Sequence, residues 1–337
     1  MFFFLWAGAR LIKKNDKKKK SINYYKREKE EKRVVIEGMR GKQALVLSQL
    51  ALFCIAVTVL VFTVLIYTNK NKNNHEKDTE TPLHAADESE SGLAESMIMR
   101  ALFVAKTSAK KVRLGSAFDG GYVILDEIGG YDALFSAGVS NDVNFENDFL
   151  KKFAHIPCFA FDGTVGKLPD GSHTNIQFFK KNIAATNSPA TTNLVLELEP
   201  FRDIFLKMDI EGHEYPFFLS MPLAVRRKLK QIVVEVHTPC VYGGQFDLGW
   251  TISQKLEIML RLADTHVLAH FHANNNNGTS QFKGVAVPDV FELTYVRKGE
   301  VEILGQNDDP IPGPLDAPCN TLRPDIPLNY MPFFHAV

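Results

Sequence analysis

The most constraining stretch of this sequence is a short apolar run, residues 204–208, that leads through an acidic turn into the start of a helix. The run is too short for a buried helix, so we expect it to be a central strand. Gly212 permits a sharp turn after it, and Pro216 supplies the backbone angle of a first helical turn. Between strand and helix lie four ionisable side chains: Asp209, Glu211, His213 and Glu214. Because ligands of open α/β sheets bind beyond the carboxyl ends of the strands, this acidic tip is predicted to be a functional site rather than a solvated strand end.

The chain from residue 113 to residue 300 alternates between apolar, strand-like runs and helix-like segments. This alternation predicts an α/β fold with a mostly parallel sheet covered on both faces. A hairpin that turns at 119–121 is expected to lead into the sheet, after a helix over 93–111. The predicted sheet strands are 133–137, 157–161, 175–179, 204–208, 231–236, 265–271 and 290–297. The predicted helices are 145–155, 215–229 and 250–264, and 194–200 is either a short helix or a turn.

An apolar run of 24 residues without a charge, 44–67, precedes this domain. At about 1.5 Å per residue, a helix of this length crosses a hydrocarbon core of about 30 Å, and the run is too long for a cleaved signal peptide. Residues 1–42 hold 14 Lys and Arg against 5 Asp and Glu, whereas residues 68–96 hold 3 against 7. The positive-inside rule therefore predicts a single-pass type II membrane protein, with its large domain in the lumen of the Golgi or the ER.

The chain divides into five predicted parts: a basic cytosolic tail (1–43), a transmembrane helix (44–67), a flexible stem (68–92), a domain (93–304) and a Pro-rich extended tail packed on the domain (305–337). The basic tail is expected to set topology rather than to bind nucleic acid, because aromatic interleaving and a basic fold are missing. Asn277 begins a glycosylation sequon, which is usable if the domain is lumenal. Beyond the apolar run lie Cys158, Cys240 and Cys319, which allow at most one intrachain disulfide.

Polar residues also end the first two predicted sheet strands. Gly138 follows the first strand and would let a ligand approach the backbone, and Glu146 brings a carboxylate to the next helix. Asp162 ends the second strand, where it could bind ribose hydroxyls or form a local Asx turn. Neither a three-glycine dinucleotide fingerprint nor a phosphate-binding P-loop occurs. These strand ends therefore suit a ligand with hydroxyls and a cationic group better than one with phosphates.

Three histidines lie at the ends of later strands. His237 ends the strand 231–236, while His270 and His272 lie at the end of the strand 265–271 and face the same side of it. Histidine is the natural general base near neutral pH, so each is a candidate base. His270 and His272 could also be metal ligands, but no ligand spacing of a known metal site appears, and no metal is predicted.

Taken together, these segments resemble the FkbM-type methyltransferases, a family of class I S-adenosylmethionine-dependent enzymes that are mostly O-methyltransferases. The resemblance covers about residues 113–300, and its most specific part is the Lys-Met-Asp-Ile-Glu-Gly stretch. It implies a Rossmann-like sheet of seven strands with the last strand antiparallel, and a cofactor that lies over the first two strands. The matching segments are Asp119-Gly-Gly-Tyr-Val, Phe135-Ser-Ala-Gly-Val-Ser-Asn-Asp-Val-Asn-Phe-Glu146, Phe161-Asp-Gly, Leu206-Lys-Met-Asp-Ile-Glu-Gly-His-Glu214, Val234-Glu-Val-His and Glu292-Leu-Thr-Tyr-Val-Arg297.

The resemblance also implies the cofactor-binding residues. The segment from Ser136 to Gly138 would line the methionine end of S-adenosylmethionine, and Glu146 and Asp162 would make polar contacts, Asp162 with the ribose. Asp209 would lie beside the transferring methyl group and the acceptor. The Gly-x-Gly of many methyltransferases is absent here, since Gly138 stands alone.

The sequence therefore predicts a membrane-anchored O-methyltransferase that uses S-adenosylmethionine and methylates a hydroxyl of a glycan or another lumenal acceptor. His237 is the first candidate for the base that removes the acceptor proton, followed by Asp209 and His272, whereas Lys207 is expected to balance charge. One alternative is a type II glycosyltransferase, which shares the anchor and stem but usually needs an Asp-x-Asp motif that is poorly placed here. The other is a non-catalytic scaffold, which would tolerate the loss of Asp209 and His237.

Overall fold

The computed structural model describes residues 96–237 and 250–335, all of which belong to one compact unit, Leu83–Val337. The predicted cytosolic tail (1–43), transmembrane helix (44–67) and stem (68–92) lie outside these residues and stay predictions. Of the helices that the structure describes, none is both long and apolar enough to cross a membrane.

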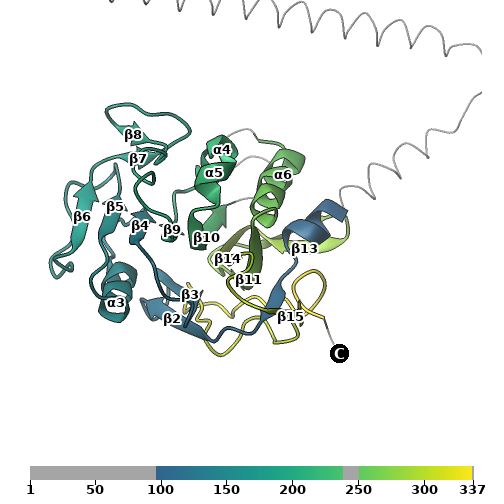
Figure 1. Ribbon diagram of the computed structural model, residues 1–337. Helices are drawn as coiled ribbons and strands as arrows, with labels where there is room; N and C mark the ends of the chain where they lie inside the picture. The colour runs from purple at the N-terminus through teal and green to yellow at the C-terminus, as the bar shows by residue number, and fades with distance from the viewer. Residues whose placement is uncertain (1–95, 238–249, 336–337) are drawn as a thin grey trace, which may run out of the picture. The chain divides into compact units, whose positions relative to one another are not determined.

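A sheet of seven strands forms the centre of the unit, in the order β11-β14-β10-β9-β4-β5-β6 (Figure 1). Neighbouring strands are parallel, except that β14 runs antiparallel to both β10 and β11. All seven predicted sheet strands and the antiparallel last strand are thus confirmed, and the sheet fits a Rossmann-like methyltransferase fold. The bounds are β4 (Ala133–Ala137), β5 (Cys158–Phe161), β6 (Ile176–Phe179), β9 (Ile204–Met208), β10 (Leu229–His237), β11 (His266–Ala273) and β14 (Val290–Arg297).

Different elements cover the two faces of this sheet. The helices α4 (Glu214–Ser220), α5 (Leu223–Arg226) and α6 (Ile252–Ala263) lie on one face (Figure 1). On the other face lie α3 (Asn144–Lys152) and a hairpin of β2 (Lys111–Gly115) and β3 (Gly121–Leu125). We call these the α4–α6 face and the α3 face. The hairpin confirms the predicted turn at 119–121.

The single helix predicted over 215–229 is wrong, because the chain forms α4 and α5 with a break between them. Met221 has an extended backbone (φ −71°, ψ 120°) because Pro222 follows it. A proline disfavours the helical conformation in the residue before it and has no N–H to continue the helix. In contrast, α6 begins close to its predicted start, where Thr251 and Gln254 form a capping box.

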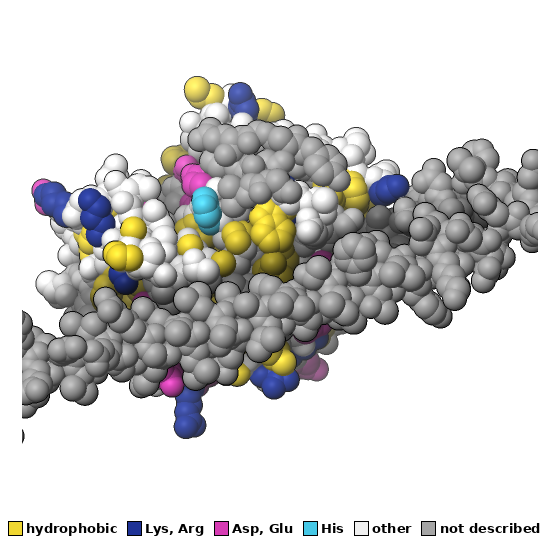
Figure 2. All heavy atoms as spheres, turned by 90° about the horizontal axis from the view of Figure 1, so that it is seen from above, with side chains coloured by type: hydrophobic (Ala, Val, Ile, Leu, Met, Phe, Trp, Pro, Cys, Tyr) yellow, Lys and Arg dark blue, Asp and Glu magenta, His cyan; other side chains and the backbone are white. Residues whose placement is uncertain are grey.

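The side chains of the sheet strands alternate between two environments. On the α4–α6 face they join the main apolar core, which includes Phe135, Leu206, Val234, Phe271 and Leu293. Figure 2 shows the molecule from this side, where hydrophobic side chains lie near the middle of the visible described surface and Lys and Arg side chains lie mostly toward its edges. On the α3 face, Leu134, Phe205 and Val233 form a second core with the hairpin and α3. Further along the same strands this face becomes polar, with Ser136, Lys207, Glu235 and Thr294 all buried.

Several short elements depart from the predictions. Residues 96–101 are helical, but β1 (Ala105–Thr107) follows and pairs antiparallel with β15 (Ile303–Gln306), so the helix predicted over 93–111 is wrong beyond residue 101. The sequence does not predict the pair β7 (Asn182–Ile183) and β8 (Thr191–Thr192), nor the hairpin β12 (Thr279–Phe282) and β13 (Val285–Pro288). Residues 194–200 form turns.

The Pro-rich segment after β15 has no helix or strand over residues 307–335. It still contributes apolar side chains to the core, because Ile311, Leu328 and Phe333 are buried there. This segment therefore packs on the domain in irregular, extended form, below β11 and β14 in the view of Figure 1. It also brings polar residues to the α3 face of the sheet.

Candidate active site

Four ionisable side chains form a row across neighbouring strands on the α3 face: Asp209 beyond the end of β9, Glu235 on β10, Glu292 on β14 and His272 on β11. The register of the sheet produces this row. Met208 is the partner of Val234, Glu235 is the partner of Glu292, and Glu292 is the partner of His272. Partners across neighbouring strands share a face, so the four side chains lie side by side. We call them the polar row.

Asp209 has one carboxylate oxygen engaged and the other without a partner. The Tyr122 hydroxyl donates a hydrogen bond to Oδ2 over 3.3 Å. The other oxygen, Oδ1, is buried and has no hydrogen-bond partner among the described residues. Because a buried acceptor without a donor is costly, Oδ1 is a natural acceptor for a ligand that brings a donor.

Lys207 lies on the same face, two residues before Asp209. Its Nζ donates to the backbone oxygen of Gly138 over 2.7 Å and lies 5.5 Å from the centre of the Tyr122 ring. The buried lysine thus ties β9 to the loop that follows β4, and it places a positive charge next to the acidic tip.

His237 lies among three carboxylates. Its Nδ1 is 3.1 Å from Oε1 of Glu214, and its Nε2 is 3.2 Å from Oε2 of Glu211 and 3.5 Å from Oε2 of Glu235. Burial alone lowers the pKa of this imidazole, but the hydrogen bonds to Glu211 and Glu214 and the charges of Glu214 and Glu235 outweigh it and raise the pKa to about 11. At neutral pH the ring is therefore an imidazolium, which cannot take up a further proton.

The acidic turn after β9 is built around this histidine. Glu211 adopts a left-handed backbone (φ 57°), and the hydrogen bond to His237 lowers the pKa of its carboxyl group. Oε1 of Glu214 also accepts the backbone N–H groups of Ile210 and Gly212 over 3.2 and 3.3 Å. Asp209, Glu211 and His237 each offer a ligand atom, and these atoms lie within 4.8 Å of one another. The turn therefore gathers oxygen and nitrogen atoms that could also bind a cation.

The predicted cofactor residues near β4 are close together. The buried Ser136 hydroxyl donates to Oε1 of the buried Glu146, whose Oε2 has no hydrogen-bond partner in the part of the chain that the structure describes. Gly138 has φ 75°, and a Cβ atom there would lie 1.6 Å from the backbone oxygen of Asp209. Glycine is therefore needed because the tip of β9 fills this space, a different reason from the predicted close approach of a ligand.

Asp162 joins the loops that follow β4 and β5. Its Oδ2 accepts the N–H of Ser140 over 2.8 Å, and its Oδ1 accepts the N–H and the hydroxyl of Thr164 over 2.7 and 2.6 Å. Burial raises the pKa of this carboxyl group, but the hydrogen bonds outweigh it and lower the pKa below its usual value. Asp162 thus makes the local turn that the sequence allows, and its ionised oxygens keep lone pairs for further donors.

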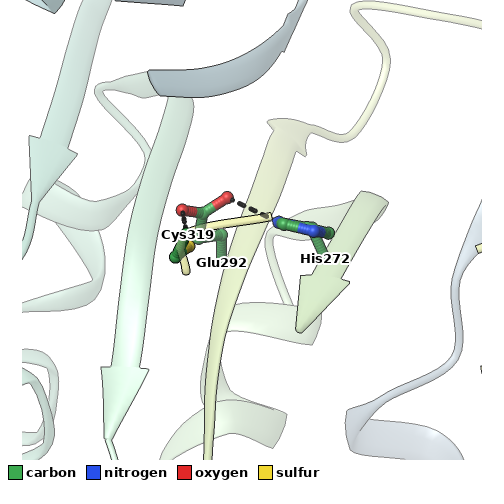
Figure 3. Close-up of side chains that lie close together, drawn as sticks. All are labelled: His272, Glu292 and Cys319. Carbon is green, nitrogen blue, oxygen red and sulfur yellow. Dashed lines mark hydrogen bonds and ion pairs between the residues drawn. The ribbon is translucent and has the colours of Figure 1, made fainter. Parts of the chain in front are cut away.

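His272 and His270 have partners from the Pro-rich segment. Nδ1 of His272 lies 3.1 Å from Oε2 of Glu292, and its Nε2 lies 3.0 Å from Oδ2 of Asp325. The first interaction is drawn as a dashed line in Figure 3. Burial alone lowers the pKa of His272, but Asp325 and Glu292 raise it to about 10. For His270, whose Nε2 lies 2.8 Å from Oδ1 of Asp316, burial prevails and the pKa is lowered.

The structure thus gathers most of the predicted residues at one edge of the sheet and adds four that the sequence analysis misses. Glu235 and Glu292 were detectable, since alternation along Val234-Glu-Val-His places Glu235 on the side of His237. Asp316 and Asp325 lie in a segment without a periodic pattern, so no local signal connects them to the histidines. The candidate bases His237 and His272 are held as cations. Of the other two candidates, His270 is bonded to Asp316, whereas Asp209 has an oxygen without a partner among the described residues.

Residues 124–277 match the family model described as the methyltransferase FkbM domain. The match confirms the resemblance to this family over these residues. The matched range includes every predicted cofactor-binding and catalytic residue, while Glu292 and the Pro-rich segment lie beyond it. No curated protein gives a significant sequence match to the chain.

Solved structures give weak likenesses. A protein named a putative hemolysin from Lactococcus lactis is 16% identical, with a TM-score of 0.32, over 51% of this chain and 81% of that one. One of the same name from Streptococcus thermophilus is 11% identical, with a TM-score of 0.30, over 66% and 70%. Precorrin-6y C5,15-methyltransferase from Geobacter metallireducens is 9% identical, with a TM-score of 0.26, over 61% and 89%. Likenesses this weak indicate neither an activity nor a ligand for this chain.

Proposed function

We propose that this protein is an S-adenosylmethionine-dependent O-methyltransferase, anchored in a membrane by residues 44–67, that methylates a hydroxyl of a glycan or another lumenal acceptor. The observation that carries this proposal is the buried Oδ1 of Asp209, which has no hydrogen-bond partner among the described residues and lies at a strand tip within the FkbM family match. The position is where open α/β sheets bind their ligands.

The atoms at the strand ends fit S-adenosylmethionine by their chemistry. Oε2 of Glu146 is a buried acceptor without a donor among the described residues, and Asp162 is an ionised acceptor on the neighbouring strand. The ammonium and ribose hydroxyl groups of S-adenosylmethionine are donors. Ser136, Gly138 and Glu146 would hold its methionine end and Asp162 its ribose. When bound, it supplies a methyl group on a sulfonium, which is already a good leaving group.

Asp209 is the residue that takes the proton of the acceptor hydroxyl in this proposal. Its Oδ1 is a buried acceptor for which the described residues supply no donor, whereas His237 is already protonated at neutral pH. His237 acts instead as a cation that holds Glu211 and Glu235 in place. The protein then contributes mainly by positioning the acceptor oxygen and removing its proton.

The remaining features support a lumenal, hydroxyl-rich acceptor. The polar row presents several carboxylate oxygens, which accept hydrogen bonds and suit a sugar with many hydroxyl donors.

Asn277 is exposed in the turn between β11 and β12, so its sequon is accessible to glycosylation in a lumenal domain. For this topology, we expect the removal of N-linked glycans to change the mass of the native protein but not the mass of Asn277→Gln.

Calorimetric titration of the full chain in detergent, with S-adenosylmethionine and S-adenosylhomocysteine, tests the cofactor. We expect dissociation constants between about 1 μM and 1 mM, the usual range for enzyme substrates. Asp162→Asn should weaken binding at least about tenfold, because one good hydrogen bond to a charged group is worth about 1.5–3 kcal/mol. Asp170→Asn, which changes a fully exposed carboxylate, is the matched control. A folded chain that binds neither compound would overturn the proposal, and competition by a sugar nucleotide would favour a glycosyltransferase.

Labelled methyl transfer to glycan acceptors separates binding from chemistry. Asp209→Asn keeps the size of the side chain but removes the proton acceptor, so transfer should fall by about 10²–10⁴-fold while cofactor binding persists. Transfer that survives in Asp209→Asn would exclude Asp209 as the base.

A further inference from the structure

We propose that His272, Glu292 and Cys319 form a binding site for one divalent transition-metal ion, with zinc as the best match. The three residues come from β11, β14 and the Pro-rich segment, and Figure 3 shows their side chains converging. We call this group the tail metal site. The inference goes beyond methyl transfer and does not depend on it.

Each carboxylate oxygen of Glu292 lies near one of the other two ligand atoms, at a distance close to that between the ligands of a tetrahedral zinc site. Zinc bonds of about 2.0–2.3 Å imply ligand atoms about 3.3–3.8 Å apart. Sγ of Cys319 lies 3.7 Å from Oε1 of Glu292, and Nδ1 of His272 lies 3.1 Å from Oε2 of the same residue. All three ligand atoms lie within 4.8 Å of one another. Small side-chain adjustments therefore suffice to centre an ion between them.

The second nitrogen of His272 has the partner that metal-binding histidines usually have. Nε2 lies 3.0 Å from Oδ2 of Asp325, which leaves Nδ1 directed at Glu292. A carboxylate on the distal nitrogen fixes the orientation and tautomer of a ligand histidine and makes it a better donor to the metal. His272 is almost fully buried, so this orientation is also fixed by packing.

The charges around the site favour a bound cation. Glu235 and Glu292 are direct partners across β10 and β14, and both are buried. Like charges directly opposite each other on a sheet are destabilising, and more so when water is excluded. Nδ2 of Asn274 donates to Glu235 over 2.7 Å, and the imidazoliums of His237 and His272 offset part of the repulsion, at 3.5 Å from Glu235 and 3.1 Å from Glu292. A divalent ion at Glu292 would reduce the repulsion directly.

The ligand types select the metal. A thiolate and an imidazole suit zinc and related transition metals, whereas magnesium and calcium prefer oxygen ligands alone. On binding, the Cys319 thiol and Nδ1 of the His272 imidazolium each lose a proton to solvent as the metal–sulfur and metal–nitrogen bonds form, so that no oxidant or reductant is required. The ion would fasten the Pro-rich segment to two strands of the sheet.

Cobalt(II) titration of the purified full chain tests the site, because thiolate-bound cobalt has a charge-transfer absorption band in the near ultraviolet. We expect one equivalent of cobalt, a band of this kind, and its displacement by zinc. Cys319→Ser should abolish the band, while Cys158→Ser, at a fully buried cysteine on β5, should keep it. Asp325→Asn should weaken binding by about 10–100-fold, as is usual for the outer partner of a ligand histidine.

Two results would overturn the tail metal site. One is a charge-transfer band of equal strength in Cys319→Ser and the native chain, with near-ultraviolet circular dichroism showing both to be folded. The other is mass spectrometry without reduction that finds Cys319 in a disulfide. Both readouts are independent of methyl transfer, so they leave the enzymatic proposal untouched.

Discussion

The two faces of the central sheet are made by the same strands and yet differ in what they do. On β14, Phe291 points into the main apolar core and its neighbour Glu292 points into the polar row. On β9, Leu206 and Met208 lie in that core, whereas Lys207 lies on the α3 face. The α4–α6 face therefore stays apolar up to the strand ends, while the α3 face changes from apolar to charged along its length.

This difference indicates that stability and function are carried by opposite sides of the same strands. The α4–α6 face buries large apolar side chains, and this burial is the main favourable contribution to folding. The strand ends of the α3 face hold opposed carboxylates, and buried oxygens to which no described residue donates; each of these lowers stability unless a ligand is bound. Such arrangements are typical of functional sites, where stability is sacrificed for activity.

The largest effect is expected from Phe291→Ala compared with Glu292→Gln. Phe291 is fully buried with its ring centre 4.6 Å from that of Phe271, so truncation should lower the free energy of unfolding by about 3–5 kcal/mol. Glu292→Gln keeps the volume and relieves the repulsion with Glu235, but it also removes the charged partner of His272. Because the two effects oppose each other, the loss should be smaller than that of Phe291→Ala. Urea denaturation of both variants with a metal chelator present measures the difference. Equal losses would show that the two faces contribute alike.

A smaller effect is expected from Gly138→Ala, which tests the contact between the strand tips. The new Cβ would meet the backbone oxygen of Asp209, so we expect a loss of about 2–3 kcal/mol, high among single substitutions. Gly171→Ala is the matched control, because Gly171 also has a positive φ (87°) but no atom within 4 Å of a Cβ. It should cost only the conformational strain of about 1–2 kcal/mol. Thermal unfolding of the two variants measures these losses. Equal losses would show that the loop after β4 and the β9 tip shift easily to admit the new Cβ.

The smallest effect is expected in the pH dependence of stability. The folded pKa of His237, about 11, lies above the usual 6.5, so its stabilisation is complete below pH 6.5 and is lost as the pH rises toward 11. Between pH 7 and 8 this one proton accounts for at most about 1.4 kcal/mol of unfolding free energy. His237→Gln should flatten the decline by up to this amount, and His213→Gln, on the exposed side of the same turn, is the control. If the unfolding free energy of His237→Gln declined with pH as steeply as that of the native protein, His237 would not be an imidazolium among these carboxylates.

The strands of the sheet could be predicted from the sequence because each is a short apolar run between turn residues. The break between α4 and α5 was also readable, since Pro222 is visible in the sequence. The pairing of β1 with β15 could not be predicted, because residues about 200 positions apart decide it. The same holds for Asp316 and Asp325, whose roles depend on where an aperiodic segment crosses the sheet. The protonation of the predicted bases could not be predicted either, because it depends on the carboxylates that surround each histidine in space.

The contact between Gly138 and the backbone of Asp209 has a mechanical consequence. With no side chain between them, the loop after β4 and the tip of β9 touch backbone to backbone, and Lys207 adds a hydrogen bond to the same loop. Close-packed backbone has little room to deform, so the two tips move as one rigid part. A ligand that binds against the loop after β4 therefore also fixes the position of the β9 tip. In the proposed reaction, the cofactor-binding loop and the base Asp209 cannot change position independently.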